Sequence, residues 1–155
     1  MLARIFTIIG SIFYLLWAAL HIQAGDAVAK LGRSVHPSML QARLYQDAWM
    51  LYFAAGLIAL FSITAIFSEW RPAYWLNFGI AFVTDVSFII FVLVPHYMAA
   101  WPGVEGPAAW ACGLAFSTAG LILARRRDAH RAGPASPEAS VVVEHIGEFE
   151  PRTAH

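Results

Sequence analysis

An aspartate lies near the middle of a long apolar run, where a charged side chain is costly. Asp85 belongs to the run from Ala73 to Val94. This run is long enough to cross a bilayer as a helix, because the hydrocarbon core needs about 20 apolar residues. Ionisable residues at that depth are rare and usually belong to a binding site or a proton pathway. An apolar setting favours the neutral acid, which can donate a proton. Asp85 is therefore the first candidate for a functional residue.

A histidine in the first apolar run is the expected partner of this aspartate. At 100° per residue, His21 shares a helical face with Thr7, Gly10, Tyr14 and Trp17. We expect Asp47 to orient the imidazole ring. A carboxylic acid beside an imidazole suits isomerisation, protonation or hydration of an apolar molecule. The predicted catalytic residues are Asp85, His21 and Asp47, and the expected ligand is lipid-like or isoprenoid-like.

Five further residues are expected to line the ligand site: Tyr14, Trp17, Asn77, Thr84 and His96. His96 falls within about 20° of Asp85 if one helix carries both. A structural interpretation stands beside the catalytic one. Asp85 would then hydrogen-bond to a neighbouring polar group and fix only the order of the helices, at about 0.6 kcal/mol for such a contact. In that interpretation the histidines are interfacial and Asp47 marks the start of a helix.

A second hypothesis is electron transfer through a bound metal. Histidines on separate membrane helices can ligate a haem on its two faces, and His21 with His96 is the pair that would fit. His36 with Met39, or His96 with Met98, offers imidazole and thioether ligands that suit copper. No covalent haem-attachment motif is present, and we predict no other metal site.

A third hypothesis is a structural subunit of a membrane complex without chemistry of its own. Ala109, Gly113 and Ser117 recur at four-residue intervals, as do Ala55 and Ala59. Small residues at this spacing let membrane helices approach closely. Such a stripe fits closure of one chain and a homo-oligomer equally well. Transport is less favoured, because no span is broken midway by Gly and Pro.

Composition defines the class of protein to which these residues belong. Hydrophobic residues make up 59% of the 155 residues and charged residues 13%, which is typical of an integral membrane protein. Basic residues do not form the clustered patch that nucleic-acid binding requires. The single cysteine, Cys112, cannot form an internal disulfide and is expected to be a small packing residue.

The elements that must position the candidate residues are four apolar spans. We predict an all-α membrane protein with an antiparallel four-helix transmembrane bundle in residues 1–127, followed by a flexible tail in 128–155. Polar composition with repeated Gly and Pro predicts disorder in the tail. The expected spans are Ile5 to Ala24, Ala48 to Phe67, Ala73 to Val94 and Pro107 to Ala124.

Positive charge predicts the orientation of the bundle. Arg4, Arg71 and the arginines from Arg125 to Arg131 would gather on one side, which the positive-inside rule assigns to the cytoplasm together with both termini. The chain is thus expected to be a multi-pass protein of the cell membrane. Gly25 to Gln46 mixes charged and apolar residues, so we expect part of it to form a short amphipathic helix on the outer surface, as a lid over the site.

Overall fold

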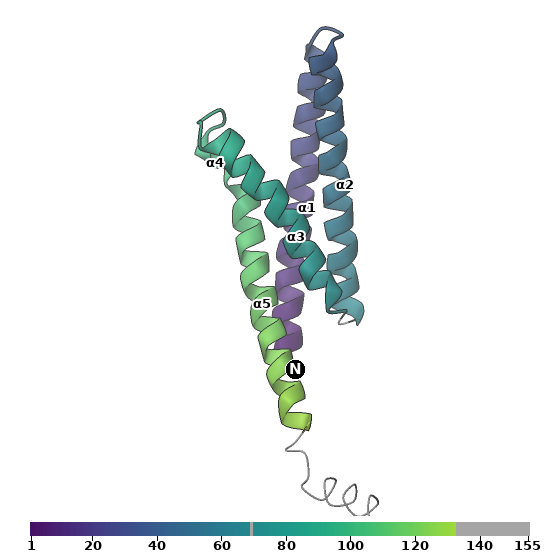
Figure 1. The fold of residues 1–155 in the computed structure, drawn as a ribbon, viewed down its shortest axis with the longest axis vertical. Helices are drawn as coiled ribbons and strands as arrows, with labels where there is room; N and C mark the ends of the chain where they lie inside the picture. Colours follow the sequence, from purple (N-terminus) through teal and green to yellow (C-terminus); the bar gives the residue numbers. More distant parts are fainter. Residues whose placement is uncertain (69, 133–155) are drawn as a thin grey trace, which may run out of the picture.

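The computed structural model describes residues 1–68 and 70–132, and these residues form helices connected by short turns (Figure 1). The predicted tail lies outside the described residues, except that residues 128–132 continue the last helix. The helices, in chain order, are α1 (Leu2–Ser34), α2 (Met39–Ser68), α3 (Pro72–Phe88), the π-helical segment η1 (Ile89–Leu93), α4 (Ala100–Gly103) and α5 (Glu105–Ala132).

Four of the helices are long and apolar enough to cross a membrane, as expected for a multi-pass membrane protein, and the described residues form no strand. The four helices are α1, α2, α3 continued by η1, and α5. The predicted spans 5–24, 48–67 and 107–124 lie inside α1, α2 and α5, and the span predicted at 73–94 differs by one residue at each end from Pro72–Leu93. Hydrophobicity alone was sufficient to find these elements.

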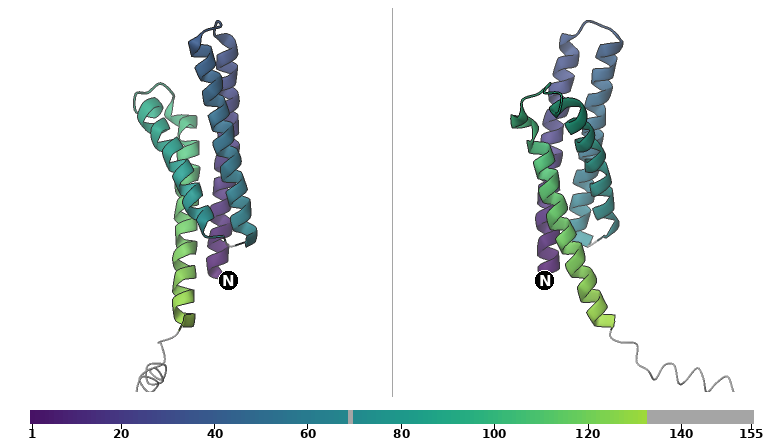
Figure 2. Two further views of the ribbon diagram at one scale, coloured as in Figure 1. Left: turned by 45° about the vertical axis from the view of Figure 1, so that its right-hand side comes forward. Right: turned by 60° about the vertical axis from the view of Figure 1, so that its left-hand side comes forward.

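The long helices pack around α1. It lies along both α2 and α5, while α3 slants across the molecule between α2 and α5 (Figures 1 and 2). The chain runs from one end of the molecule to the other along α1, returns along α2, goes out again along α3 and returns along α5. The starts of α1 and α3 and the end of α5 therefore share one end of the molecule.

The separate outer helix predicted for Gly25 to Gln46 is not present. Those residues continue α1 to Ser34 and begin α2 at Met39, so the two helices form one long hairpin. The hairpin extends past the end of α3 and the start of α5 and does not fold over them as a lid (Figure 1). Its glycines have a packing role: a Cβ on Gly25 would lie 2.7 Å from the ring of Tyr52, and one on Gly32 would lie 3.0 Å from the ring of Tyr45.

The end of α3 also differs from the regular helix that the sequence pattern predicts. Hydrogen bonds from Val94 N to Ile89 O and from Tyr97 N to Val92 O span five residues, so the last turn is wide. The helix then ends, and His96 takes a positive φ of 60° in the following turn. Because the helix does not reach His96, the expected common face with Asp85 is lost.

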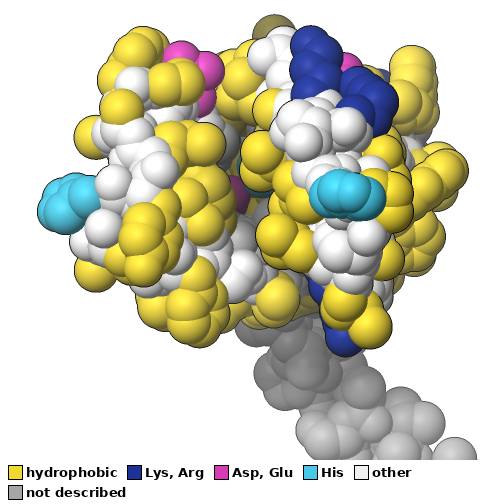
Figure 3. All heavy atoms as spheres, turned by 90° about the horizontal axis from the view of Figure 1, so that it is seen from above, with side chains coloured by type: hydrophobic (Ala, Val, Ile, Leu, Met, Phe, Trp, Pro, Cys, Tyr) yellow, Lys and Arg dark blue, Asp and Glu magenta, His cyan; other side chains and the backbone are white. Residues whose placement is uncertain are grey.

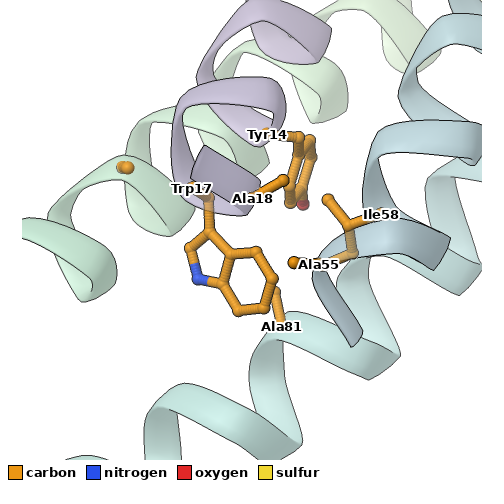
Figure 4. Close-up of a cluster of buried hydrophobic side chains, with 7 residues drawn as sticks. Tyr14, Trp17, Ala18, Ala55, Ile58 and Ala81 are labelled. Carbon is orange, nitrogen blue, oxygen red and sulfur yellow. The ribbon is translucent and has the colours of Figure 1, made fainter. Parts of the chain in front are cut away.

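A buried apolar layer joins all four long helices. Tyr14, Trp17 and Ala18 of α1 pack against residues of the other three, with the Trp17 ring close to Ala81 of α3 (Figure 4). The side chains of Trp17 and Tyr14 are 0% and 1% exposed. The other members of this layer are Ala55, Ile58, Ala81 and Ala109.

Three glycines spaced seven residues apart on α5 lie in its contact with α1. Gly106, Gly113 and Gly120 of α5 face His21, Tyr14 and Thr7 of α1, in that order. The pairs run in opposite directions along the two helices. A Cβ on any of the three glycines would lie within 2.7–3.2 Å of the facing side chain. Small residues thus let α5 approach the large side chains of α1.

The small-residue stripe of α5 is therefore used within the chain. A Cβ on Gly10 would lie 2.8 Å from the backbone nitrogen of Ser117 and 3.0 Å from the carbonyl oxygen of Gly113. This part of the helix pair is in close backbone contact. The stripe consequently gives no separate support to a subunit interface.

Candidate functional site

The candidate site is built from one face of α1 and one residue of α3. Trp17 and His21 lie one turn apart on α1, and both are buried. Asp85 of α3 is 0% exposed and lies against them. The predicted face of α1 is confirmed, since Gly10, Tyr14, Trp17 and His21 are all buried along it.

Two side chains of α1 approach the two carboxyl oxygens of Asp85, and one of them donates a hydrogen bond. The indole Nε1 of Trp17 donates a hydrogen bond of 2.7 Å to Oδ2. His21 Nε2 lies 3.4 Å from Oδ1, which is an ion-pair contact and longer than a hydrogen bond of normal strength. The rings of Trp17 and His21 are stacked, with centroids 3.5 Å apart. The carboxyl group is therefore fixed in position from one side.

The backbone determines which nitrogen of His21 carries a proton. Nδ1 lies 2.9 Å from the carbonyl oxygen of Trp17, one helical turn earlier. A carbonyl oxygen only accepts hydrogen bonds, so Nδ1 must be the donor. In a neutral imidazole, Nε2 would then present its lone pair to Asp85. This arrangement is favourable only if the carboxyl group or Nε2 carries a proton.

Charge balance leads to the same conclusion. Among the ion pairs of residues 1–68 and 70–132, His21 is the only partner of Asp85. A buried carboxylate without a countercharge is strongly disfavoured in an apolar protein interior. The pair is therefore either a neutral acid beside a neutral imidazole, or a carboxylate beside an imidazolium. In both states, one proton lies between Oδ1 and Nε2.

One side of the pair faces a glycine of α5. A Cβ on Gly106 would lie 3.0 Å from His21 Cε1 and 3.7 Å from Asp85 Oδ1, so the absence of a side chain lets the α5 backbone approach the pair. Oδ1 is buried and has no hydrogen-bond donor within the described chain. Seen from the hairpin end, the molecule is hollowed between its two halves, with acidic side-chain atoms at the floor of the hollow (Figure 3).

A second polar layer lies deeper along the same helices. Asn77, two turns before Asp85 on α3, donates a 3.0 Å hydrogen bond through Nδ2 to Ser62 Oγ of α2. Its Oδ1 and the hydroxyl group of Tyr14 are buried without a partner in the described residues. Thr84, also expected to line the site, donates to the carbonyl oxygen of Ile80. Tyr14 and Asn77 thus keep unused polar atoms.

Two predicted site residues lie elsewhere. Asp47 is exposed and lines a shallow surface pocket with Arg43, Gln46 and Met50. The carbonyl group of Trp17 orients the His21 ring, which is the role expected of Asp47. His96 is exposed in the turn after α3. The structure therefore brings together Asp85, His21 and Trp17, with Tyr14 in the adjoining layer.

The arrangement gives less support to a metal centre. His21 uses Nδ1 for the Trp17 carbonyl group and Nε2 for Asp85, so ligating a haem would require it to give up one of these contacts. Its expected partner, His96, lies outside the helix. Within residues 1–68 and 70–132, no three His, Cys, Asp or Glu side chains are grouped to hold a metal ion.

Two features of the site were missed in the sequence. Gly106 was not among the predicted site residues, although it is the first of three glycines on α5 that face α1. The seven-residue spacing of Gly106, Gly113 and Gly120 matches the spacing of His21, Tyr14 and Thr7, and this signal could have revealed the pairing. Ser62, the partner of Asn77, has no comparable signal because it depends on how α2 meets α3.

Comparison with models of protein families, with curated proteins and with solved structures finds no match for this chain. The function is therefore argued from the geometry of the site.

Proposed function

We propose that this protein binds a hydrophobic small molecule, lipid-like or isoprenoid-like, and transfers a proton to or from it. His21 and Asp85 would be the acid–base pair, within an antiparallel four-helix transmembrane bundle. The observation that carries the proposal is the hydrogen bond from His21 Nδ1 to the Trp17 carbonyl oxygen. It directs Nε2 toward Asp85, which lies 3.4 Å away, and supports one proton shared by the two buried groups.

Asp85 would act as the acid and His21 as the base. In the neutral state, Asp85 donates its proton to the ligand, and the resulting carboxylate is stabilised by the Trp17 indole. His21 Nε2 then accepts a proton from another position of the ligand, and the transfer of that proton to Asp85 restores the starting state. Such a cycle suits double-bond isomerisation of an apolar molecule, because no net proton is consumed.

The surroundings support a ligand that enters from the bilayer. Large apolar side chains cover the outer surfaces of the long helices, as expected where they face lipid. We propose that the positive-inside rule places both termini in the cytoplasm, because Arg4, Arg71 and the arginines of the α5 end share one end of the molecule. The His21–Asp85 pair would then lie in the outer half of the membrane.

Deuterium exchange tests the proposal without knowledge of the natural substrate. The purified protein in lipid nanodiscs is incubated in heavy water with a panel of isoprenoid alcohols and unsaturated sterols, and the extracted panel is examined by mass spectrometry. Wild-type protein should introduce carbon-bound deuterium into at least one compound. Asp85→Asn should abolish this incorporation, since an amide cannot supply the proton.

The matched control is Asp26→Asn, the same chemical change in the hairpin, where Asp26 accepts a hydrogen bond from Tyr52. It should exchange deuterium at the wild-type rate. Equal incorporation by wild type and Asp85→Asn would contradict the proposal. A wild-type protein that labels no panel member, and from which native mass spectrometry releases no bound apolar molecule, would contradict it as well.

A further inference from the structure

A polar cavity lies near the end of the molecule that holds the starts of α1 and α3 and the end of α5. Its volume is about 100 Å³, which is room for several water molecules or a small polyol group. Neither member of the pair lines it, so it is a separate site. The polar residues along its wall are Thr7, Ser11, Tyr74, Asn77 and Ser117.

Three arginines from separate parts of the chain line this cavity. Arg4 comes from the start of α1, Arg71 precedes α3, and Arg127 lies near the end of α5. Asp128 pairs with Arg71 and lies 3.6 Å from Arg127, which leaves Arg4 outside these ion pairs. Arg71 directly precedes a membrane span, so this part of the cavity lies at the depth of lipid headgroups.

The interior of the cavity holds an unused hydrogen-bond acceptor. Asn77 is 2% exposed, and its amide nitrogen is held by Ser62. This bond directs Oδ1 elsewhere, and Oδ1 has no partner among the described residues. A buried amide oxygen without a donor is costly, so an occupant with a hydroxyl group would be favoured. Asn77 lies six residues after Arg71, or about 9 Å along the helix.

We propose that this cavity binds an anionic phospholipid with a hydroxylated headgroup. The phosphate group would lie between the arginines, which are suited to phosphate recognition, and a headgroup hydroxyl would donate to Asn77 Oδ1. The adjacent Trp70 is 42% exposed, as expected for an aromatic ring at the membrane interface. The site is independent of the proposed proton transfer and fits a lipid that stabilises the fold from one leaflet.

Native mass spectrometry of the full-length protein tests this site. Phosphatidylglycerol, phosphatidylmethanol and phosphatidylcholine with identical acyl chains are titrated separately in one detergent. The first two carry the same charge, but only phosphatidylglycerol has free hydroxyl groups. We expect the wild-type protein to bind phosphatidylglycerol most tightly and phosphatidylcholine least. This ranking needs no substitution and so does not depend on the folding of a variant.

Two matched variants then test the position of the phosphate group. Arg4→Gln removes an arginine of the cavity wall without breaking an ion pair, and should weaken phosphatidylglycerol binding about fivefold. Arg131→Gln removes the same charge from α5 outside the cavity, and should change binding less than about twofold. Equal effects of the two variants would overturn the proposal, because they would indicate that the arginine-rich end of the molecule attracts phosphatidylglycerol by its total charge and not at one site.

The Asn77 contact has its own test. Asn77→Leu should remove the preference for phosphatidylglycerol over phosphatidylmethanol while retaining the binding of phosphatidylmethanol. Equal wild-type affinities for these two lipids would overturn the role of Asn77. Displacement of bound phosphatidylglycerol by an equal concentration of inorganic phosphate would show that the site takes a free anion, and would overturn the assignment to a lipid.

Discussion

Trp17 and Asp85 connect α1 to α3 through a hydrogen bond of 2.7 Å between the indole Nε1 and Oδ2. Both residues are 0% exposed, so the bond has no competition from water. It anchors one carboxylate oxygen and leaves the other next to His21. The bond thus distinguishes an anchored oxygen from the oxygen to which we assign proton transfer.

Trp17→Phe should destabilise the protein by at least about 1–2 kcal/mol, because Asp85 loses the only hydrogen-bond donor that the described residues offer it and the smaller phenyl ring fills less of the buried space. The measurement is the free energy of unfolding in mixed micelles, obtained by titration with a denaturing detergent. Trp49→Phe is the control, since Trp49 is 73% exposed and should change stability by less than about 0.5 kcal/mol. Equal effects of the two changes would contradict the importance of the bond.

The protonation of His21 can be observed directly. Solid-state NMR of protein labelled with ¹⁵N-histidine in lipid should show a protonated Nδ1 for His21, because that atom donates to the Trp17 carbonyl oxygen. The signal is assigned by its loss in His21→Gln. An unprotonated Nδ1 would show that the ring is oriented differently, and would remove the basis for a shared proton at Nε2.

Two glycine substitutions should change the free energy of unfolding in opposite directions. Gly10→Ala should destabilise the protein by about 1–3 kcal/mol, because its Cβ would lie within 3.0 Å of the α5 backbone. Gly56→Ala should stabilise it by up to about 1 kcal/mol, since nothing lies within 4 Å and alanine favours a helix. Unfolding in mixed micelles measures both. A stabilising Gly10→Ala would contradict the close contact of α1 with α5.

The turn after α3 predicts a preference for glycine at position 96. His96 has a φ of 60°, a conformation that costs other residues about 1 kcal/mol relative to glycine. His96→Gly should therefore be more stable than His96→Ala by about that amount in thermal unfolding. Both variants lack the imidazole group, so the comparison isolates the backbone. An alanine variant as stable as the glycine variant would place His96 in another conformation.

The sequence was most informative about features that belong to a single helix. The four spans follow from hydrophobic length, and the buried face of α1 follows from the helical repeat that aligns Tyr14, Trp17 and His21. The selection of Asp85 follows from the cost of an ionisable group in the membrane. Each of these inferences needs only one helix.

Features that depend on two helices were harder to predict. The sequence cannot show that the Trp17 indole reaches Asp85, because this depends on how α3 crosses α1. The wide η1 turn and the early end of the helix moved His96 away from the predicted site. Gly25 and Gly32 lie in the stretch predicted to contain a separate outer helix, whereas the rings of Tyr52 and Tyr45 pack against them inside a continuous hairpin.

The hairpin of α1 and α2 has a practical consequence. With 33 and 30 residues, these helices are about 50 Å and 45 Å long, whereas the hydrocarbon core of a bilayer is about 30 Å thick. The turn at residues 35–38 should therefore stand clear of the lipid on a rigid stalk. A helical protein inserted at this turn, continuous with both helices, would serve as a rigid fiducial for electron cryomicroscopy of a 17.1 kDa membrane protein.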